Sequence, residues 1–511
     1  MMRSALLLTV LLASCSGTLG DGDEERGVDA APVDDADAPV SDVADVTVDA
    51  DADLPDTAEA TGLRGEYFDD YDDPRVTRVD ANVDFDWPTE KPVAGVPHDW
   101  FSARWSGELL VDAAETYTFE TRSDDGVRLV IDGEKVIENW TGHFPTTNTG
   151  SIALSAGRHR IVLEYFQLDL GATIQLYWSS KTVARALVPT SALRPAKARS
   201  AARAPAPPYV NPVYAKDCPD PGVLRVEEEG RAAYYMSCTG GVFRVYRSRD
   251  LVRWAATSGA ILPAGKAPWS ANGGRNWAPE LHAVGGKYVA YFTAVNAADK
   301  LAIGAASATS PVGPWTVSAA PLVDDPTPGV IDATFFRDDD GKQYLYWKRD
   351  GNAIGKPTPI FVRELRADGL GFAAGSAATQ VLTNDPGSWE GGVVEAPWVV
   401  RRGGNVYMFY SGNVYDRRYR TGVARAGSPK GPFTKLGAPI LANNAGFLGP
   451  GHGSVVRAHD ADFFVYHAWI NDGSGSPAPG GRQVLVDAIT WAGGWPKIAD
   501  GTPSIAPQPW P

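Results

Sequence analysis

The sequence contains few cysteines, only three among 511 residues, which excludes a small domain held together by many disulfides. Positive charge is not in excess either, because 47 lysines and arginines face 62 aspartates and glutamates, and nothing indicates a nucleic-acid partner. Glycine, proline and tryptophan are abundant instead, with 54, 39 and 16 residues, a composition typical of a loop-rich β protein. At this length the chain should form two or more domains.

Long apolar runs are also missing, apart from one short stretch at the N-terminus. The chain begins MMRSALLLTVLLASC, in which one arginine precedes an apolar segment too short to cross a bilayer. This pattern predicts export. The small residues before Cys15 resemble a bacterial lipobox, so we expect residues 1–15 to be a lipoprotein signal peptide that leaves the protein lipid-anchored and surface-exposed on the cell envelope. An ordinary signal peptide with a chance cysteine is the alternative.

An acidic segment follows and accounts for nearly all of the net charge. Residues 21–61 contain fifteen Asp or Glu and one Arg, a net charge of −14. The whole chain carries −15 and Arg3 adds one positive charge, so residues 62–511 carry only −2. Low hydrophobicity with charge of one sign predicts a disordered tether over residues 16–61 rather than an acidic binding surface.

The other two cysteines are candidates for a disulfide. Cys218 and Cys238 each lie ten residues from Glu228, which is part of the turn-like sequence EEEGR. If this turn is the tip of a hairpin, the two cysteines face each other across two strands, and export would permit a bridge. Two reduced thiols in a core are the alternative.

Residues 62–194 have the pattern of a β-sandwich. Apolar and polar residues alternate in segments such as WSGELLVDAAETYTFE and GRHRIVLEYFQ, with turn signals between them. Together with the opening GLRGEYF, the stretch SDDGVRLVIDGEKVIENW resembles the protective-antigen fourteen-kilodalton module. That module is a lectin-like sandwich found beside many secreted glycosidases. A linker rich in Pro and Ala follows at residues 195–208.

Two successive aspartates of this region, Asp124 and Asp125, are a candidate metal site. In sugar-binding members of the module family, such a pair holds a Ca²⁺ ion that in turn binds sugar hydroxyls. Carboxylate oxygens suit this hard cation. The resemblance therefore implies a calcium site here, with a metal-free turn as the alternative.

From residue 209 onward the sequence repeats five times. Each unit begins with a polar or aromatic residue ahead of a strand, continues with an aromatic strand such as YVAYFTA, YLYWK or VYMFYS, and closes with a turn containing Trp or Phe. The five leading residues are Asp220, Trp277, Asp332, Glu395 and His452. Five such units predict a five-bladed β-propeller over residues 209–511. The expected fold class is therefore all-β, a propeller preceded by a lectin-like sandwich.

Three of the five leading residues are carboxylates. The first strand of each propeller blade lines the central channel, so these side chains should converge on one axis. A purely structural channel has no need of grouped carboxylates, whereas their mutual repulsion separates their pKa values in a way that suits catalysis. Asp220 lies between two prolines in CPDPG. Alone it would be interpreted as a turn residue, but the repeat places it at the axis.

The order and spacing of these motifs resemble glycoside hydrolase family 43, whose inverting enzymes are five-bladed propellers that act on arabinose- and xylose-containing plant polysaccharides. The resemblance covers nearly all of residues 209–511. It implies that Asp220 is the general base, that Glu395 is the general acid, and that Asp332 orients this acid and favours its protonated form. Inversion needs the base and the acid roughly 6.5–9.5 Å apart, which non-adjacent blades allow.

The same resemblance implies three further site residues. Trp277, in WAPELH, would border the sugar pocket, and Arg482, in GGRQVLVDAITW, would contact the sugar. His452, in GPGHGSVV, would help to hold a hydrated metal ion at the propeller axis, for which Ca²⁺ is the candidate. A core histidine without metal is the alternative for His452. No organic cofactor is implied.

Other acidic residues lie close to these motifs. Glu390, in SWEGG, is the main rival for the general acid. Glu280, in WAPELH, is expected to point outward along its strand, and Asp338–Asp340 are interpreted as a hairpin turn.

The sequence thus predicts a glycosidase that acts on plant cell-wall polysaccharide and touches the membrane only through its lipid anchor. An α-L-arabinofuranosidase or arabinanase is favoured. A β-xylosidase is the first alternative, because loops such as 256–276 and 370–394 rather than the carboxylates would set sugar specificity. A related furanosidase propeller is a further alternative, and a non-catalytic carbohydrate-binding propeller is the alternative from another class.

Overall fold

The structure is a computed structural model that describes residues 60–68, 74–168, 171–197, 209–228 and 230–511. The predicted signal peptide and nearly all of the predicted tether lie outside these residues. Among the residues described, no helix is long and apolar enough to cross a bilayer. The helical elements of this part of the chain are two 3-10 turns, η1 (Thr190–Ala192) and η2 (Gly351–Ile354).

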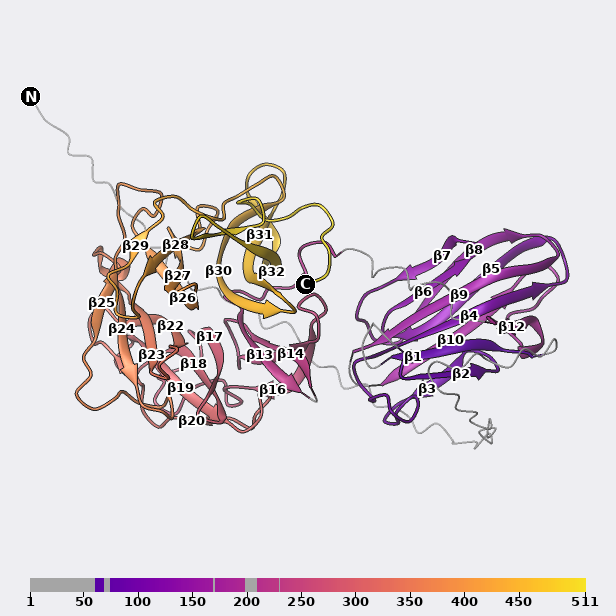
Figure 1. The fold of residues 1–511 in the computed structure, drawn as a ribbon, viewed down its shortest axis with the longest axis horizontal. Coiled ribbons are helices and arrows are strands. Elements are labelled where there is room, and N and C mark those ends of the chain that lie inside the picture. Colours follow the sequence, from indigo (N-terminus) through magenta and orange to yellow (C-terminus); the bar gives the residue numbers. More distant parts are fainter. Residues whose placement is uncertain (1–59, 69–73, 169–170, 198–208, 229) are drawn as a thin grey trace, which may run out of the picture. The chain divides into compact units, whose positions relative to one another are not determined.

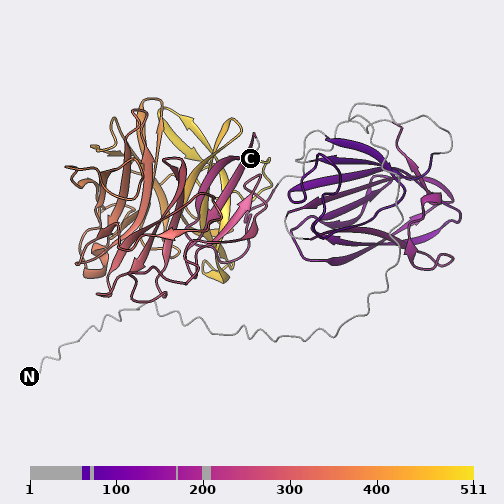
Figure 2. The ribbon, with the colours of Figure 1, turned by 90° about the horizontal axis from the view of Figure 1, so that it is seen from below.

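The first domain consists of two antiparallel sheets, seen as separate layers in Figure 2. Its strands are β1 (Leu63–Phe68), β2 (Val76–Asp80), β3 (Asp84–Trp87), β4 (Phe101–Val111), β5 (Glu115–Asp124), β6 (Val127–Ile131), β7 (Glu134–Asn139), β8 (Thr146–Leu154), β9 (Gly157–Gln167), β10 (Ala172–Ser179), β11 (Ala186–Leu187) and β12 (Leu193–Pro195). One sheet has the order β2-β1-β4-β9-β6-β7, with β12 on β4, and the other has the order β11-β10-β5-β8, with β3 on β10.

Alternation along the strands builds the core between these sheets. On β5, Tyr117 and Phe119 are buried, whereas Thr118 and Glu120 are partly exposed on the other face. A buried carboxylate, Asp80, is satisfied because it accepts hydrogen bonds from the hydroxyl of Tyr67 at 2.7 Å and from Nε1 of Trp105 at 2.7 Å. The predicted sandwich is confirmed.

The second domain consists of five antiparallel blades. Blade 1 contains β13 (Gly222–Glu228), β14 (Arg231–Ser237), β15 (Arg244–Ser248) and β16 (Ala255–Ala260). Blade 2 contains β17 (Trp277–Val284), β18 (Lys287–Val295), β19 (Leu301–Ala308), β20 (Thr316–Val317) and β21 (Val323–Asp324). Blade 3 contains β22 (Val330–Arg337), β23 (Gln343–Arg349), β24 (Ile360–Leu365) and β25 (Thr379–Leu382). Blade 4 contains β26 (Val394–Arg402), β27 (Asn405–Gly412), β28 (Arg420–Ala426) and β29 (Thr434–Lys435). Blade 5 contains β30 (Phe447–Ala458), β31 (Ala461–Asn471), β32 (Pro477–Ala492) and β33 (Trp495–Ile498).

The blades form a closed ring around one axis. Figure 1 shows that the innermost strands β13, β17, β22, β26 and β30 surround this axis, and each contacts the next, with β30 meeting β13. The segment ahead of blade 1 pairs with the C-terminal segment through Tyr209 and Gln508. It also pairs with β32 of blade 5 through Tyr214 and Val484. The predicted five-bladed propeller is therefore confirmed.

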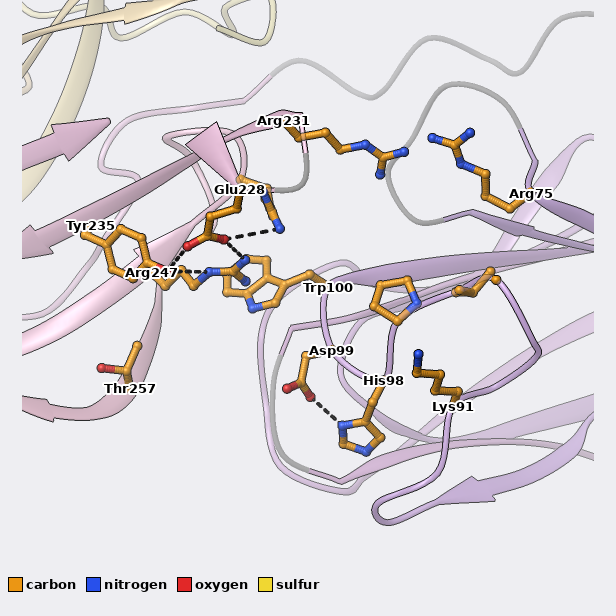
Figure 3. Close-up of a pocket in the computed structure, with 14 residues that line it drawn as sticks. Arg75, Lys91, His98, Asp99, Trp100, Glu228, Arg231, Tyr235, Arg247 and Thr257 are labelled. Carbon is orange, nitrogen blue, oxygen red and sulfur yellow. Dashed lines mark hydrogen bonds and ion pairs between the residues drawn. The ribbon is translucent and has the colours of Figure 1, made fainter. Parts of the chain in front are cut away.

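The hairpin of blade 1 carries the predicted cysteine pair. Cys218 and Cys238 form a disulfide with a Cα–Cα separation of 5.2 Å, which confirms the prediction. At the tip of the hairpin, Glu228 accepts hydrogen bonds from the hydroxyl of Tyr235 and from Nη2 of Arg247 (Figure 3). The bridge ties the segment ahead of β13 to the end of β14.

Each innermost strand contains, or closely follows, one non-glycine residue with a left-handed backbone. These residues are Asp220 (φ 57°), Ala278 (φ 44°), Asp332 (φ 58°), Ala396 (φ 54°) and His452 (φ 44°). In blades 2 to 5 the pairing with the second strand shifts register across this residue, which is the mark of a bulge. The sequence repeat aligned Trp277 and Glu395 with Asp220, Asp332 and His452. In the structure, the residues with the matching backbone conformation in blades 2 and 4 are Ala278 and Ala396, each one position later.

Four of the five blade junctions share one hydrogen bond. The N–H of the left-handed residue donates to a side chain at the end of the second strand of the preceding blade. The acceptors are Thr239 Oγ1 for Ala278 (2.7 Å), Thr293 Oγ1 for Asp332 (3.3 Å), Ser411 Oγ for His452 (2.9 Å) and His467 Nδ1 for Asp220 (3.0 Å). The junction of blades 3 and 4 differs, because Lys348 occupies the acceptor position. There the N–H of Ala396 donates to Oδ2 of Asp332 at 3.0 Å.

Candidate active site

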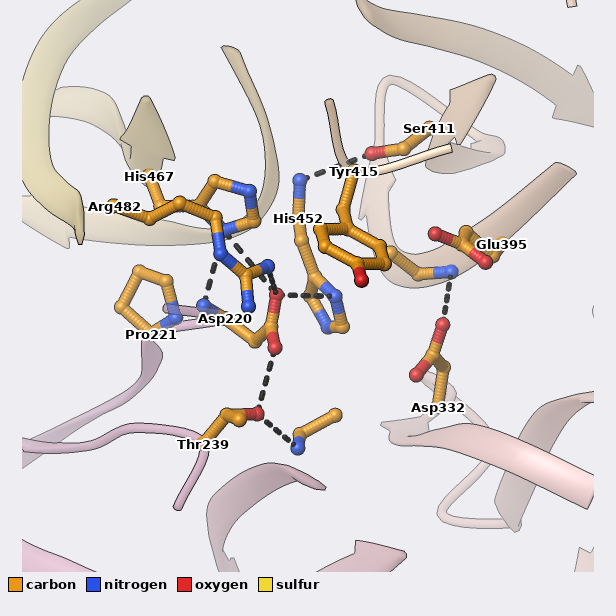
Figure 4. Close-up of polar contacts among 12 residues, drawn as sticks. Asp220, Pro221, Thr239, Asp332, Glu395, Ser411, Tyr415, His452, His467 and Arg482 are labelled. Atoms are coloured by element: carbon orange, nitrogen blue, oxygen red, sulfur yellow. Dashed lines mark hydrogen bonds and ion pairs between the residues drawn. The ribbon is translucent and has the colours of Figure 1, made fainter. Parts of the chain in front are cut away.

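Asp220 is held by polar contacts on both carboxylate oxygens (Figure 4). Its Oδ1 lies 3.1 Å from Nη1 of Arg482, 3.2 Å from Nδ1 of His452 and 3.2 Å from Nδ1 of His467, and its Oδ2 accepts a hydrogen bond of 2.6 Å from Thr239. Burial raises the pKa of Asp220, but the positive charges of Arg482 and His452 outweigh burial and hold this pKa well below its usual range. Asp220 is therefore ionised at neutral pH, as a general base must be.

The two histidines beside Asp220 have opposite charge states. Burial lowers the pKa of His467 to about 4, and Arg482 acts in the same direction. His467 is therefore neutral, which agrees with its Nδ1 accepting the backbone N–H of Asp220. Burial also disfavours the charged form of His452, but the carboxylates of Asp220 and Asp332 dominate and raise its pKa to about 9. His452 is therefore an imidazolium at neutral pH.

Glu395, at the start of β26, has donors on both carboxylate oxygens. The hydroxyl of Tyr419 donates to Oε1 at 2.8 Å, and Nζ of Lys348 donates to Oε2 at 2.8 Å. Tyr419 can approach because residue 451 is glycine, where an added Cβ would lie 2.5 Å from Cδ1 of the tyrosine ring. Figure 4 shows Glu395 and Asp220 on opposite sides of His452.

Asp332, on β22, is the third carboxylate of the group. Burial raises its pKa to about 7; the positive charge of His452 opposes this shift and the negative charge of Glu395 adds to it. Asp332 therefore retains its proton close to neutral pH. The expectation that Asp332 keeps the acid protonated stays a prediction.

The rival carboxylates have structural partners. Glu390 is buried and accepts hydrogen bonds from the hydroxyl of Tyr410 at 2.7 Å and from Nζ of Lys435 at 2.6 Å. Glu280 does not point outward as predicted. It is buried and lies 2.9 Å from Nε2 of His282, because the bulge at the start of β17 changes the direction of the side chains that follow it.

The acidic stretch 338–340 forms the predicted turn between β22 and β23. The backbone N–H of Asp338 donates to the carbonyl of Lys342 at 2.9 Å, and its carboxylate pairs with Arg401. This confirms the hairpin interpretation. Asp220 and Asp332 act on the charge of His452, as does the buried Glu280, and Figure 4 shows Glu395 on the side of His452 away from Asp220.

Comparison with known proteins identifies both domains. Residues 209–496 match the family described as glycosyl hydrolases family 43, and residues 59–192 match the PA14 domain. The chain belongs to glycosyl hydrolases family 43.

Three relatives of this family 43 chain are informative. The Beta-D-galactofuranosidase xynD of Aspergillus niger is 33% identical over 45% of this chain and 67% of its own length. The Extracellular exo-alpha-(1->5)-L-arabinofuranosidase of Streptomyces avermitilis is 27% identical over 60% of this chain and 65% of its own length, so the chain spans about two thirds of these curated relatives. A crystal structure of a thermostable family-43 glycoside hydrolase is 31% identical, with a TM-score of 0.52, over 59% of this chain and 99% of its own.

One of the two predicted sugar-binding residues of this family 43 propeller, Arg482, lies at the same group. Arg482 contacts Asp220 and places its guanidinium 5.0 Å from the ring centre of Tyr415, which is 44% exposed. Trp277 begins β17 and is partly exposed. The roles of Arg482 and Trp277 in sugar binding stay predictions. Tyr415 was not foreseen, and an exposed aromatic beside Arg482 offers a surface on which a sugar ring can stack.

Other contacts of the site were also missed. They come from Thr239, Lys348, Tyr419 and His467. A signal for three of them was present, because Thr239, Thr293, Lys348, Ser411 and His467 lie in or just after the five aromatic strands of the repeat.

The expected calcium sites do not offer a direct set of ligands. Both oxygens of Asp125 accept backbone hydrogen bonds, from His143 at 2.7 Å and from Leu168 at 2.8 Å. Within the described part of the chain, no group of three or more His, Cys, Asp or Glu is arranged to hold a metal ion. Calcium takes about six to eight oxygen ligands, so water would have to supply most of them at either site. The calcium sites stay a prediction, which calorimetric titration with CaCl₂ would check.

Proposed function

We propose that the propeller is an inverting glycoside hydrolase that cleaves arabinose-containing plant polysaccharide, as an α-L-arabinofuranosidase or arabinanase. The observation that carries this proposal is the pairing of an ionised Asp220 with a second carboxylate, Glu395, on a non-adjacent blade. Inverting hydrolysis needs two carboxylates on opposite faces of the sugar, with room for a water molecule beside the base.

Each side chain then has a defined task. Asp220 accepts a proton from the attacking water, and its contacts with Arg482, His452 and Thr239 fix the direction from which the water approaches the anomeric carbon. Glu395 gives a proton to the leaving oxygen. Asp332, which accepts a hydrogen bond from the backbone N–H of Ala396, supplies a second carboxyl group next to this acid, and burial raises the pKa of Asp332 to about 7.

Support for arabinose comes from the name of the Streptomyces avermitilis relative, which acts on an α-(1->5)-linked arabinofuranoside. A β-xylosidase is the alternative, because loops around the same carboxylates would set the choice of sugar. A propeller that only binds carbohydrate would not need an ionised carboxylate, Asp220, together with a second carboxyl group, Asp332, whose pKa is raised to about 7.

The test is hydrolysis of 4-nitrophenyl α-L-arabinofuranoside, 4-nitrophenyl β-D-xyloside and debranched arabinan, with the first sugar released from the best substrate followed by proton NMR. Turnover of an arabinose substrate with inversion at the anomeric carbon is expected. Activity on the xyloside alone would keep the chemistry and change the sugar. Binding to arabinan without turnover of any substrate would overturn the proposal in favour of a lectin.

We also propose that the protein is exported and anchored by lipid at Cys15. The disulfide between Cys218 and Cys238 suits an oxidising compartment, and the Streptomyces relative is named as extracellular. If Cys15 carries the lipid, a Cys15→Ala variant should leave the membrane fraction for the soluble fraction. Unchanged membrane association of this variant would contradict the anchor.

A further inference from the structure

We propose that Lys348 is a positioning residue for the general acid, which holds Glu395 by one oxygen and balances the charge of the carboxylates around it. The inference rests on the proposed role of Glu395. It concerns a lysine that the sequence repeat places where the other blades carry a hydrogen-bond acceptor.

Lys348 is an almost completely enclosed ammonium group. Its side chain is 1% exposed, and its Nζ lies 2.8 Å from Oε2 of Glu395 and 3.0 Å from Oδ1 of Asp350. An isolated ammonium in such a place would be strongly unfavourable, so the lysine depends on both carboxylates. Because Asp350 follows β23 in the same blade, it keeps the ammonium in place when Glu395 changes its protonation state.

The blade junction shows what the lysine replaces. At the other junctions, Thr239, Thr293, Ser411 and His467 accept the N–H of the next blade. An ammonium has three donors and no acceptor, so Lys348 cannot do the same. The N–H of Ala396 therefore goes to the carboxylate of Asp332, which fixes that carboxylate against the strand that carries Glu395.

The lysine also determines which oxygen of Glu395 can hold a proton. Oε2 faces the ammonium, which cannot accept a hydrogen bond. Oε1 faces the hydroxyl of Tyr419, which can rotate and act as either donor or acceptor. Burial holds the pKa of Tyr419 well above its usual value, so this hydroxyl stays neutral. For Glu395 to act as the acid, Oε1 is therefore the oxygen that can carry the proton, while Lys348 keeps Oε2 in place.

Lys348 supplies a positive charge in direct contact with the acid. The other titratable groups of the site are Asp350, which contacts Lys348, Tyr419, which contacts Glu395, and Asp220, Asp332 and His452; Glu280 acts on His452, and Arg482 and His467 lie at Asp220. The positive charges of Lys348 and His452 both favour the ionised form of Asp332. Loss of the lysine removes one of these two charges, so Asp332 should hold its proton more tightly.

The test compares Lys348→Met with Lys435→Met. The second lysine is a matched control, because its Nζ forms a similar pair with the non-catalytic Glu390, at 2.6 Å. In Lys348→Met, kcat should fall at least about tenfold on an oligosaccharide and much less on the 4-nitrophenyl glycoside, whose leaving group needs little protonation. The alkaline limb of kcat/KM should move up by about one pH unit or more. Lys435→Met should change neither quantity.

A second measurement does not depend on turnover. In protein labelled with ¹³C at the aspartate carboxyl carbons, the signal lost in Asp332→Asn reports the titration of Asp332, which should move to higher pH in Lys348→Met. An unmoved midpoint would overturn the proposal, as would equal losses on both substrates. No activity in the wild-type protein, together with the expected shift of the midpoint, would refute the proposed function while leaving the role of Lys348 in the carboxyl pair supported.

Discussion

Replacement of Asp220 by alanine should remove turnover of every glycoside, whatever its leaving group, with a loss of about 10²–10⁴ in kcat. Without this carboxylate no group accepts the proton of the attacking water. An inverting enzyme forms no covalent intermediate through which the reaction could otherwise proceed. The measurement is kcat for the 4-nitrophenyl glycoside and for an oligosaccharide, in the variant and in the wild type.

The neighbouring charges make this prediction sharper. Alanine at position 220 also leaves the buried positive charges of Arg482 and His452 without their partner, so folding must be checked by thermal unfolding. Asp220→Asn keeps the shape of the side chain and should lose activity to a similar extent. Asp338→Ala, in the turn after β22, is the control that should retain activity. Substantial turnover by Asp220→Asn would exclude Asp220 as the base.

Much of the fold could be predicted because it repeats. The five units of the propeller each carry an aromatic strand and a closing turn, and this pattern survives in one sequence even where individual residues differ. The grouping of Asp220, Asp332 and Glu395 followed from the repeat, since the first strand of every blade must face the axis. The hairpin around Glu228 likewise predicted the disulfide, because equal distances from a tight turn bring two residues opposite each other.

What could not be predicted depends on backbone conformation and on contacts between blades. The sequence aligned Glu395 with Asp220, but the left-handed residue of blade 4 is Ala396, and a one-residue offset at a bulge has no signature in residue type. The inward direction of Glu280 has the same origin. Lys348 was visible as the end of YLYWK, but its contact with Glu395 crosses a blade junction, which no pattern within one repeat reveals.

Replacement of Glu395 by alanine should produce a loss that depends on the leaving group, unlike the loss in Asp220→Ala. A general acid matters most when the departing oxygen is a poor leaving group, so kcat on an oligosaccharide should fall by about 10²–10⁴. The 4-nitrophenyl glycoside should lose far less, because its phenolate leaves without full protonation. The measurement is the ratio of the two kcat values, which should rise strongly in Glu395→Ala and stay near the wild-type ratio in Asp220→Ala.

The rival carboxyl groups supply the control for this experiment. Glu390 is held by Tyr410 and Lys435, which do not contact the carboxyl groups of the site, so Glu390→Gln should leave the ratio of the two kcat values unchanged even if it lowers the unfolding temperature.

The alkaline side of the pH profile gives a second readout for Glu395. Because burial raises the pKa of Asp332 to about 7, Asp332 loses its proton as the pH rises through this value, and wild-type kcat/KM should decline there because the acid side of the site then carries one proton fewer. Glu395→Ala removes the group that donates this proton, so the decline should disappear for the 4-nitrophenyl substrate. A decline that persists unchanged in Glu395→Ala would assign the acid to another residue.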